Sequence, residues 1–104
     1  MQDLIERQKI LDWLNQFAQS IFIRGPMYGS FAEQEATLVT LLSVRDFILG
    51  LSPRNSLDNS RNEICKKYQL KTIFSFSDQF QDKQPSIKEQ EQFSQILKDW
   101  WEYE

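Results

Sequence analysis

The chain has 104 residues, of which 40% are hydrophobic and 13% aromatic, a composition that is typical of a folded protein and excludes a disordered chain. A net charge of −3 excludes a positive field over the whole molecule, so nucleic acid or an anionic membrane could be contacted only through a local basic patch. The chain has no histidine, which removes the commonest general base and metal ligand and, with them, most familiar hydrolytic sites.

The first predicted element is a helix from Gln2 to Arg24. Gly25 and Pro26 predict its end, because glycine favours a helix C-cap and proline cannot continue a helix, so residues 25–29 are expected to form a turn. Apolar residues recur at three- and four-residue steps, as on a helix with one buried face. These residues are Ile10, Leu14, Phe17 and Ile21, with Leu11, Ala18 and Phe22 beside them.

A second helix is predicted to begin at Ser30. Ser30 and Glu33 have the spacing of a capping box, in which the two side chains bond to free amides at a helix start. Gly50 and Pro53 predict the end of this helix. Apolar residues occur almost all round it, so we expect the central helix of the fold. Its main face is Leu38, Leu41, Leu42, Ile48 and Leu49, and Val39, Val44, Phe47 and Leu51 extend that face.

The polar run from Ser52 to Ser60 predicts a long loop that could contain a flexible hinge. Ser60 and Glu63 form a second capping box, which predicts a short helix starting at Ser60. This helix is expected to bury Ile64 and Tyr68, with Cys65 as a further candidate.

A third capping box, Ser86 with Glu89, predicts the start of the last helix. Its apolar residues again recur at three- and four-residue steps, which predicts a buried stripe. The stripe consists of Phe93, Ile96, Leu97 and Trp100.

The segment from Ile73 to Phe80 fits two structures. Phe74 and Phe76 alternate with serines as in a strand, whereas Ile73, Phe76 and Phe80 have helical spacing. A single strand would find no partner elsewhere in the chain. We therefore predict an all-α bundle of four to five helices in one domain, residues 1–104, with one short extended segment near 72–77 as the alternative for that stretch.

Cys65 is the only cysteine, so no internal disulfide can form and a reducing environment is expected. The start of the chain, Met1-Gln2-Asp3, does not resemble a signal peptide. The most apolar stretch, residues 38–51, contains Arg45 and Asp46 and is shorter than a membrane span. These features predict a cytoplasmic protein without a membrane contact.

No catalytic or cofactor-binding pattern is present in the sequence. It lacks a Cys-x-x-Cys pair, a glycine-rich phosphate loop and a Glu-x-x-His pair, and no two carboxylates are singled out by their spacing. We therefore expect no enzymatic activity, no cofactor and no metal.

The segment from residue 54 to residue 71 is the one basic patch. Five positive and two negative charges give it +3, against −2 for residues 1–53 and −4 for residues 72–104. The simpler interpretation is a solvated helix face, and the functional one is a contact with nucleic-acid phosphates that does not depend on base sequence. The candidate phosphate contacts are Arg54, Arg61, Lys66, Lys67 and Lys71.

Four residues are candidates for a protein interface. Arg45 falls within the apolar face of the second helix, so its side chain either lies along the core edge with its head in water or pairs with a partner's carboxylate. Trp101 lies at the edge of the last stripe, where it is either a core residue or an interface anchor. Met27 and Tyr28 lie in the turn after the first helix.

These observations predict a non-catalytic helical bundle that works as a subunit or adaptor, because a small domain has limited means of covering an apolar central helix. Self-association or a protein partner would cover the rest. In size and helical character the chain also resembles the small helical-bundle subunits of CRISPR effector complexes, which are usually more basic. That resemblance involves no specific residue, and it implies a nucleoprotein subunit that contacts phosphates through residues 54–71 as the alternative function.

Overall fold

The computed structural model describes residues 2–24, 30–71, 75–80 and 86–103, without the side chains of residues 2–5, 24 and 53. It has four α-helices, α1 (Gln2–Arg24), α2 (Phe31–Ile48), α3 (Pro53–Tyr68) and α4 (Ile87–Trp101), and a 3-10 helix, η2 (Ser77–Gln79). These residues contain no strand. The prediction of an all-α bundle is confirmed.

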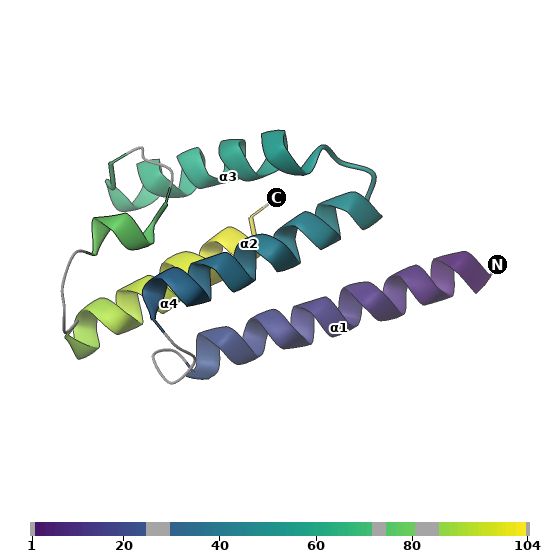
Figure 1. Ribbon diagram of the computed structural model, residues 1–104, viewed down its shortest axis with the longest axis horizontal. Helices are drawn as coiled ribbons and strands as arrows, with labels where there is room; N and C mark the ends of the chain where they lie inside the picture. Colours follow the sequence, from purple (N-terminus) through teal and green to yellow (C-terminus); the bar gives the residue numbers. More distant parts are fainter. Residues whose placement is uncertain (1, 25–29, 72–74, 81–85, 104) are drawn as a thin grey trace.

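The helices form an up-and-down bundle in which each helix runs opposite to the next one in the chain (Figure 1). α2 packs against all three other α-helices and against η2, which confirms its prediction as the central helix. α1 is the longest helix, and its N-terminal end extends beyond the rest of the bundle (Figure 1).

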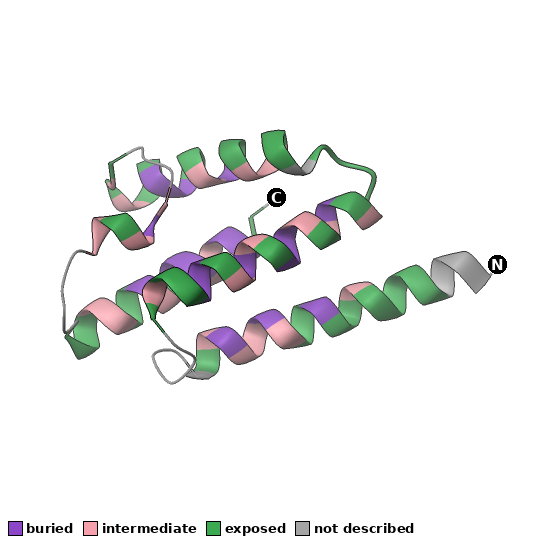
Figure 2. Ribbon diagram, viewed as in Figure 1, coloured by how far each residue is buried: buried purple, intermediate pink, exposed green. Residues whose placement is uncertain are grey.

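The predicted bounds of α1 are confirmed. Leu14, Ala18 and Ile21 are buried as expected, but Ile10 is exposed. Residues 6–10 of α1 are all exposed (Figure 2), because this end of the long helix extends beyond the rest of the bundle and has few neighbours to cover it.

α2 begins where the first capping box predicts. The Ser30 hydroxyl accepts a hydrogen bond from the Glu33 amide at 3.3 Å. Leu38, Leu41 and Leu42 are buried, whereas Leu49 and Phe47 are exposed. The wide apolar pattern is therefore only partly covered within the chain.

The prediction for α3 is wrong at its start. The helix begins at Pro53 rather than at Ser60, so residues 53–60 are not a loop. Proline is favoured in the first turn because its fixed φ suits the helix and its missing N–H would have no partner there. The polar residues that suggested a loop form the exposed face of this helix, while Leu57, Ser60 and Ile64 face inward.

α4 confirms the third capping box. The Ser86 hydroxyl accepts a hydrogen bond from the Glu89 amide at 3.1 Å and donates one to the Glu89 carboxylate at 3.2 Å. All four residues of the predicted stripe are buried: Phe93, Ile96, Leu97 and Trp100.

A buried carboxylate holds the segment before α4 in place. Glu35 accepts hydrogen bonds from the backbone amides of Phe76 and Ser77, both at 2.8 Å, and from the Ser75 hydroxyl at 2.7 Å. The Phe76 ring is buried and meets the Trp100 ring edge to face. Residues 72–74 lie outside the described part, and residues 77–79 form the 3-10 helix, so a short helix is confirmed at the end of the ambiguous stretch.

Candidate functional site

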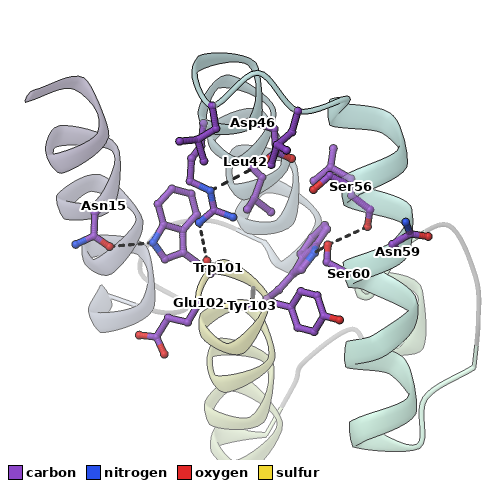
Figure 3. Close-up of a pocket in the computed structure, with 14 residues that line it drawn as sticks. Asn15, Leu42, Asp46, Ser56, Asn59, Ser60, Trp101, Glu102 and Tyr103 are labelled. Carbon is purple, nitrogen blue, oxygen red and sulfur yellow. Dashed lines mark hydrogen bonds and ion pairs between the residues drawn. The ribbon is translucent and has the colours of Figure 1, made fainter. Parts of the chain in front are cut away.

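A cavity of about 700 Å³ lies between α2, α3 and the end of α4. Figure 3 shows that α2 and α3 form two of its walls and that α4 ends in it. We call it the α2–α3–α4 pocket. Its residues are Asn15, Leu42, Arg45, Asp46, Leu49, Leu51, Ser56, Leu57, Asn59, Ser60, Trp100, Trp101, Glu102 and Tyr103.

Arg45 is bound within its own chain at one side of this pocket. Its Nη1 donates a hydrogen bond to the Trp101 carbonyl at 2.7 Å, and its guanidinium carbon lies 4.3 Å from the centroid of the Trp101 ring. Burial lowers the pKa of Arg45, an effect that the neighbouring Asp46 carboxylate opposes. The cation also lies at the C-terminus of α4, where a positive charge is favoured by the helix dipole.

Trp101 is only 4% exposed and belongs to the core. Its indole N–H donates a hydrogen bond to Asn15 Oδ1 at 2.9 Å, which links the end of α4 to α1. Arg45 and Trp101 therefore meet each other, as α2 and α4 run side by side here. The Arg45 head is therefore held at α4 of its own chain, a contact that neither interpretation of its sequence position described.

Asp46 is the functional candidate that sequence reasoning did not single out. It is 3% exposed and lines the pocket next to Arg45. The available signal was its helical spacing, because Asp46 follows Leu42 by four residues on the buried face.

Ser60 and Trp100 close the inner end of the pocket. The Trp100 indole N–H donates to the Ser60 hydroxyl at 2.6 Å, and that hydroxyl lies 3.2 Å from the Leu57 carbonyl. A buried tryptophan N–H normally has such a partner. Ser60 therefore has a packing role in the middle of α3 and does not cap a helix.

Met27 and Tyr28 lie outside the described residues. The structure therefore gives no placement for these two interface candidates.

The basic side chains of residues 54–71 do not gather in one patch, and several of them contact different carboxylates. Lys66 Nζ lies 3.3 Å from Glu63 Oε1, and Lys67 Nζ lies 2.8 Å from Asp99 Oδ2. Tyr68 also donates a hydrogen bond to Asp99. Two of the predicted phosphate contacts thus have carboxylate neighbours at the surface.

Arg61 is turned inward. Its Nη2 lies 3.5 Å from the buried Glu35 carboxylate, and its guanidinium carbon lies 4.8 Å from the centroid of the Trp100 ring. Its Nε is buried without a hydrogen-bond partner among the described residues. Arg54 and Lys71 are exposed, one near the start of α3 and the other beyond its end.

A second groove of about 480 Å³ runs between α1 and α4. We call it the α1–α4 groove. Ile23 is 84% exposed and Ile87 is 75% exposed, and both line it. Its other residues are Gln19, Phe22, Gln90, Glu91, Ser94, Gln95 and Lys98.

The described part of the chain contains no group of three or more Cys, Asp or Glu side chains placed to hold a metal ion. None of its helices has the length and apolar character needed to cross a membrane.

Comparisons with known protein families, with curated proteins and with solved structures found no match.

Proposed function

We propose that the chain is a non-catalytic interaction module that joins a larger assembly by binding a protein partner or a second copy of itself. The observation that carries this proposal is the α1–α4 groove, where Ile23 and Ile87 expose most of their surface beside each other's helices. Large apolar side chains that share one groove are typical of protein-binding surfaces. The glutamine, serine and lysine side chains around them supply the polar rim that such surfaces have.

The test is the oligomeric state of the full chain, measured by light scattering over a range of concentrations, together with recovery of the tagged chain from its own cells. We expect association with itself or with a defined protein. Ile23→Glu and Ile87→Glu should each weaken that association, because a carboxylate in the interface would have to lose its water.

Phe47→Glu is the matched control, because Phe47 is 79% exposed but does not line the groove. If Phe47→Glu alone abolishes association, the interface lies on α2. A chain that stays monomeric and recovers no specific protein would contradict the proposal.

Cytoplasmic action is part of this proposal. Cys65 is a buried free thiol whose pKa is raised by burial, so it is suited to a structural role in a reducing compartment. The absence of histidine from the sequence supports a non-catalytic role.

The alternative of a nucleoprotein subunit has weaker support from the positions of its five basic residues. Arg61 is directed to Glu35, and Lys66 and Lys67 have carboxylate neighbours. Replacing Lys66, Lys67 and Lys71 with glutamate should weaken any nucleic-acid binding for all sequences alike and reduce its salt dependence. Recovery of the tagged chain with and without nuclease separates the two functions, because only the nucleoprotein subunit would lose its partners after digestion.

A further inference from the structure

The Asp46 carboxylate lacks the partners that a buried charge normally has. It accepts no hydrogen bond from any described residue, and its one ion-pair contact there is from Oδ1 to Arg45 Nε at 4.0 Å. That distance is too long for a hydrogen bond. The Arg45 guanidinium is held instead at the end of α4, where its Nη1 donates to the Trp101 carbonyl.

A carboxylate with this little exposure is costly unless it receives hydrogen bonds. Asp46 lines the α2–α3–α4 pocket, and Figure 3 shows it across that space from the polar side chains of α3. A hydrogen-bond donor that enters the pocket can therefore reach it.

The other residues that line the pocket indicate which kind of molecule could carry this donor. Leu42, Leu49 and Leu57 provide aliphatic surface, while Ser56 and Asn59 provide small polar groups. Among the described residues, one guanidinium and two carboxylates line the pocket, those of Arg45, Asp46 and Glu102, which leaves it with a net negative charge. The volume of about 700 Å³ is within the usual range for a pocket that holds a small organic ligand.

We infer that the α2–α3–α4 pocket binds an alkylammonium group, that is, a primary ammonium on a short aliphatic chain. The ammonium donates hydrogen bonds to the Asp46 carboxylate, and the aliphatic chain lies against the leucines. An ammonium suits this site because it is a compact cation with three donors and no acceptor. A free aliphatic diamine and the lysine side chain of a partner both present this group.

The experiment is titration of the intact protein with cadaverine and with Nα-acetyl-lysine methylamide, followed by calorimetry and by the NMR signals of the Trp100 and Trp101 indole N–H groups. We expect saturable binding of at least one amine and a shift of the indole signals. Binding of cadaverine alone indicates a free diamine, and binding of the lysine derivative alone indicates a protein side chain.

Pentan-1-ol is the control ligand, because it has a similar aliphatic chain without the charge. Equal binding of pentan-1-ol and the amines would overturn the proposal, since the pocket would then be selecting apolar surface alone. Failure of both amines to bind would overturn it as well.

Asp46→Asn should weaken amine binding by about tenfold or more, because a hydrogen bond to a charged group is lost. Asp58→Asn is the matched control, since Asp58 is an exposed carboxylate on α3 that does not line the pocket. If both variants weaken binding equally, the amine is attracted only by the general surface charge and the proposal is wrong.

Ser56→Leu provides a second variant that leaves Asp46 in place and fills the pocket from α3. It should abolish amine binding while the helical circular dichroism is retained. Unchanged amine binding in a folded Ser56→Leu protein would place the site elsewhere. The α1–α4 groove shares no residue with this pocket, so failure of the alkylammonium site and failure of the proposed function are distinguishable.

Discussion

At the scale of single residues, Arg45 shows how the setting of a charge decides its role. In the sequence it interrupts an apolar face, which is consistent with either an interface or the core. In the structure its guanidinium bonds to the last turn of α4 and stacks on Trp101. Its contacts are therefore those of a residue that stabilises the fold.

Arg45→Ala is expected to lower the free energy of unfolding by about 1–3 kcal/mol, because the Trp101 carbonyl loses a charged donor in a partly buried place. Arg45→Lys should restore only part of this, since an ammonium lacks the planar group that stacks on the indole. Urea unfolding measures both, with the exposed Arg54→Ala as control. Unchanged stability together with weaker association would instead assign Arg45 to an interface.

The contacts of Asp99 predict that the free energy of unfolding decreases at acidic pH. Burial by itself raises the pKa of Asp99, but hydrogen bonds from Lys67, Tyr68 and Gln95 outweigh burial and lower the pKa below its ordinary value of 3.8. Because the folded-state pKa is lowered, the contribution to stability is present above pH 3.8 and is lost as the pH falls through the folded-state value. Urea unfolding at several acidic pH values should show a smaller loss for Asp99→Asn than for the wild type; equal losses would contradict this assignment.

The contacts of Tyr68 predict that the free energy of unfolding decreases at alkaline pH. Burial and the hydrogen bond to Asp99 raise the pKa of Tyr68 from 10.0 to about 12. A raised folded-state pKa stabilises the protein below pH 10.0, and this contribution is lost as the pH rises through about 12. Phenolate absorbance should show one tyrosine titrating late, and Tyr68→Phe should remove that phase. If the late phase persists in Tyr68→Phe, another tyrosine is responsible.

At the scale of elements, two serines of α3 have different roles, one at the N-cap and one in the core. Ser52 is the N-cap of α3, but its side chain makes no capping hydrogen bond, whereas Ser60 is buried and accepts the Trp100 indole N–H. The sequence pattern assigned Ser60 to a helix cap and Ser52 to a loop, because Ser60 and Glu63 have capping-box spacing inside a longer helix.

Ser60→Ala is therefore expected to cost about 1–3 kcal/mol, since it leaves the buried Trp100 N–H without its partner. Ser52→Ala should cost less than about 0.5 kcal/mol, as for a surface change that removes no bond. Thermal and urea unfolding of the two variants provide the comparison. A larger loss for Ser52→Ala than for Ser60→Ala would show that the start of α3 is assigned incorrectly.

At the scale of the whole molecule, burial is uneven along the long axis. The centre of α2 and the end of α4 lie in the core, whereas residues 6–10 of α1 are all exposed. Local opening requires least free energy where few contacts are broken. Stability should therefore decrease from the core towards the free end of α1.

Hydrogen exchange of backbone amides is the measurement for this gradient. Amides from Leu38 to Leu42 and from Ile96 to Trp100 should exchange slowest, and those from residue 6 to residue 10 should exchange among the fastest in helices. Protection of residues 6–10 equal to that of the core would indicate that α1 is covered in solution, for example by a second copy.

The sequence by itself determined the helical class, the bounds of α1, the starts of α2 and α4 and the buried stripe of α4. These features depend on local signals, namely apolar spacing, capping boxes and helix breakers, which act within a few residues along the chain. The same signals failed at α3, where polar residues resembled a loop but form a helix face.

Only the tertiary structure decided the roles of Glu35, Asp46, Ser60 and the Arg45–Trp101 pair. Each depends on residues far away in the chain: Glu35 on Phe76 and Ser77, Ser60 on Trp100, and Arg45 on Trp101. The pocket at Asp46 likewise exists only where α2, α3 and the end of α4 meet. Local spacing places a side chain on one face of its own helix, whereas the partner of that side chain is set by how the helices pack.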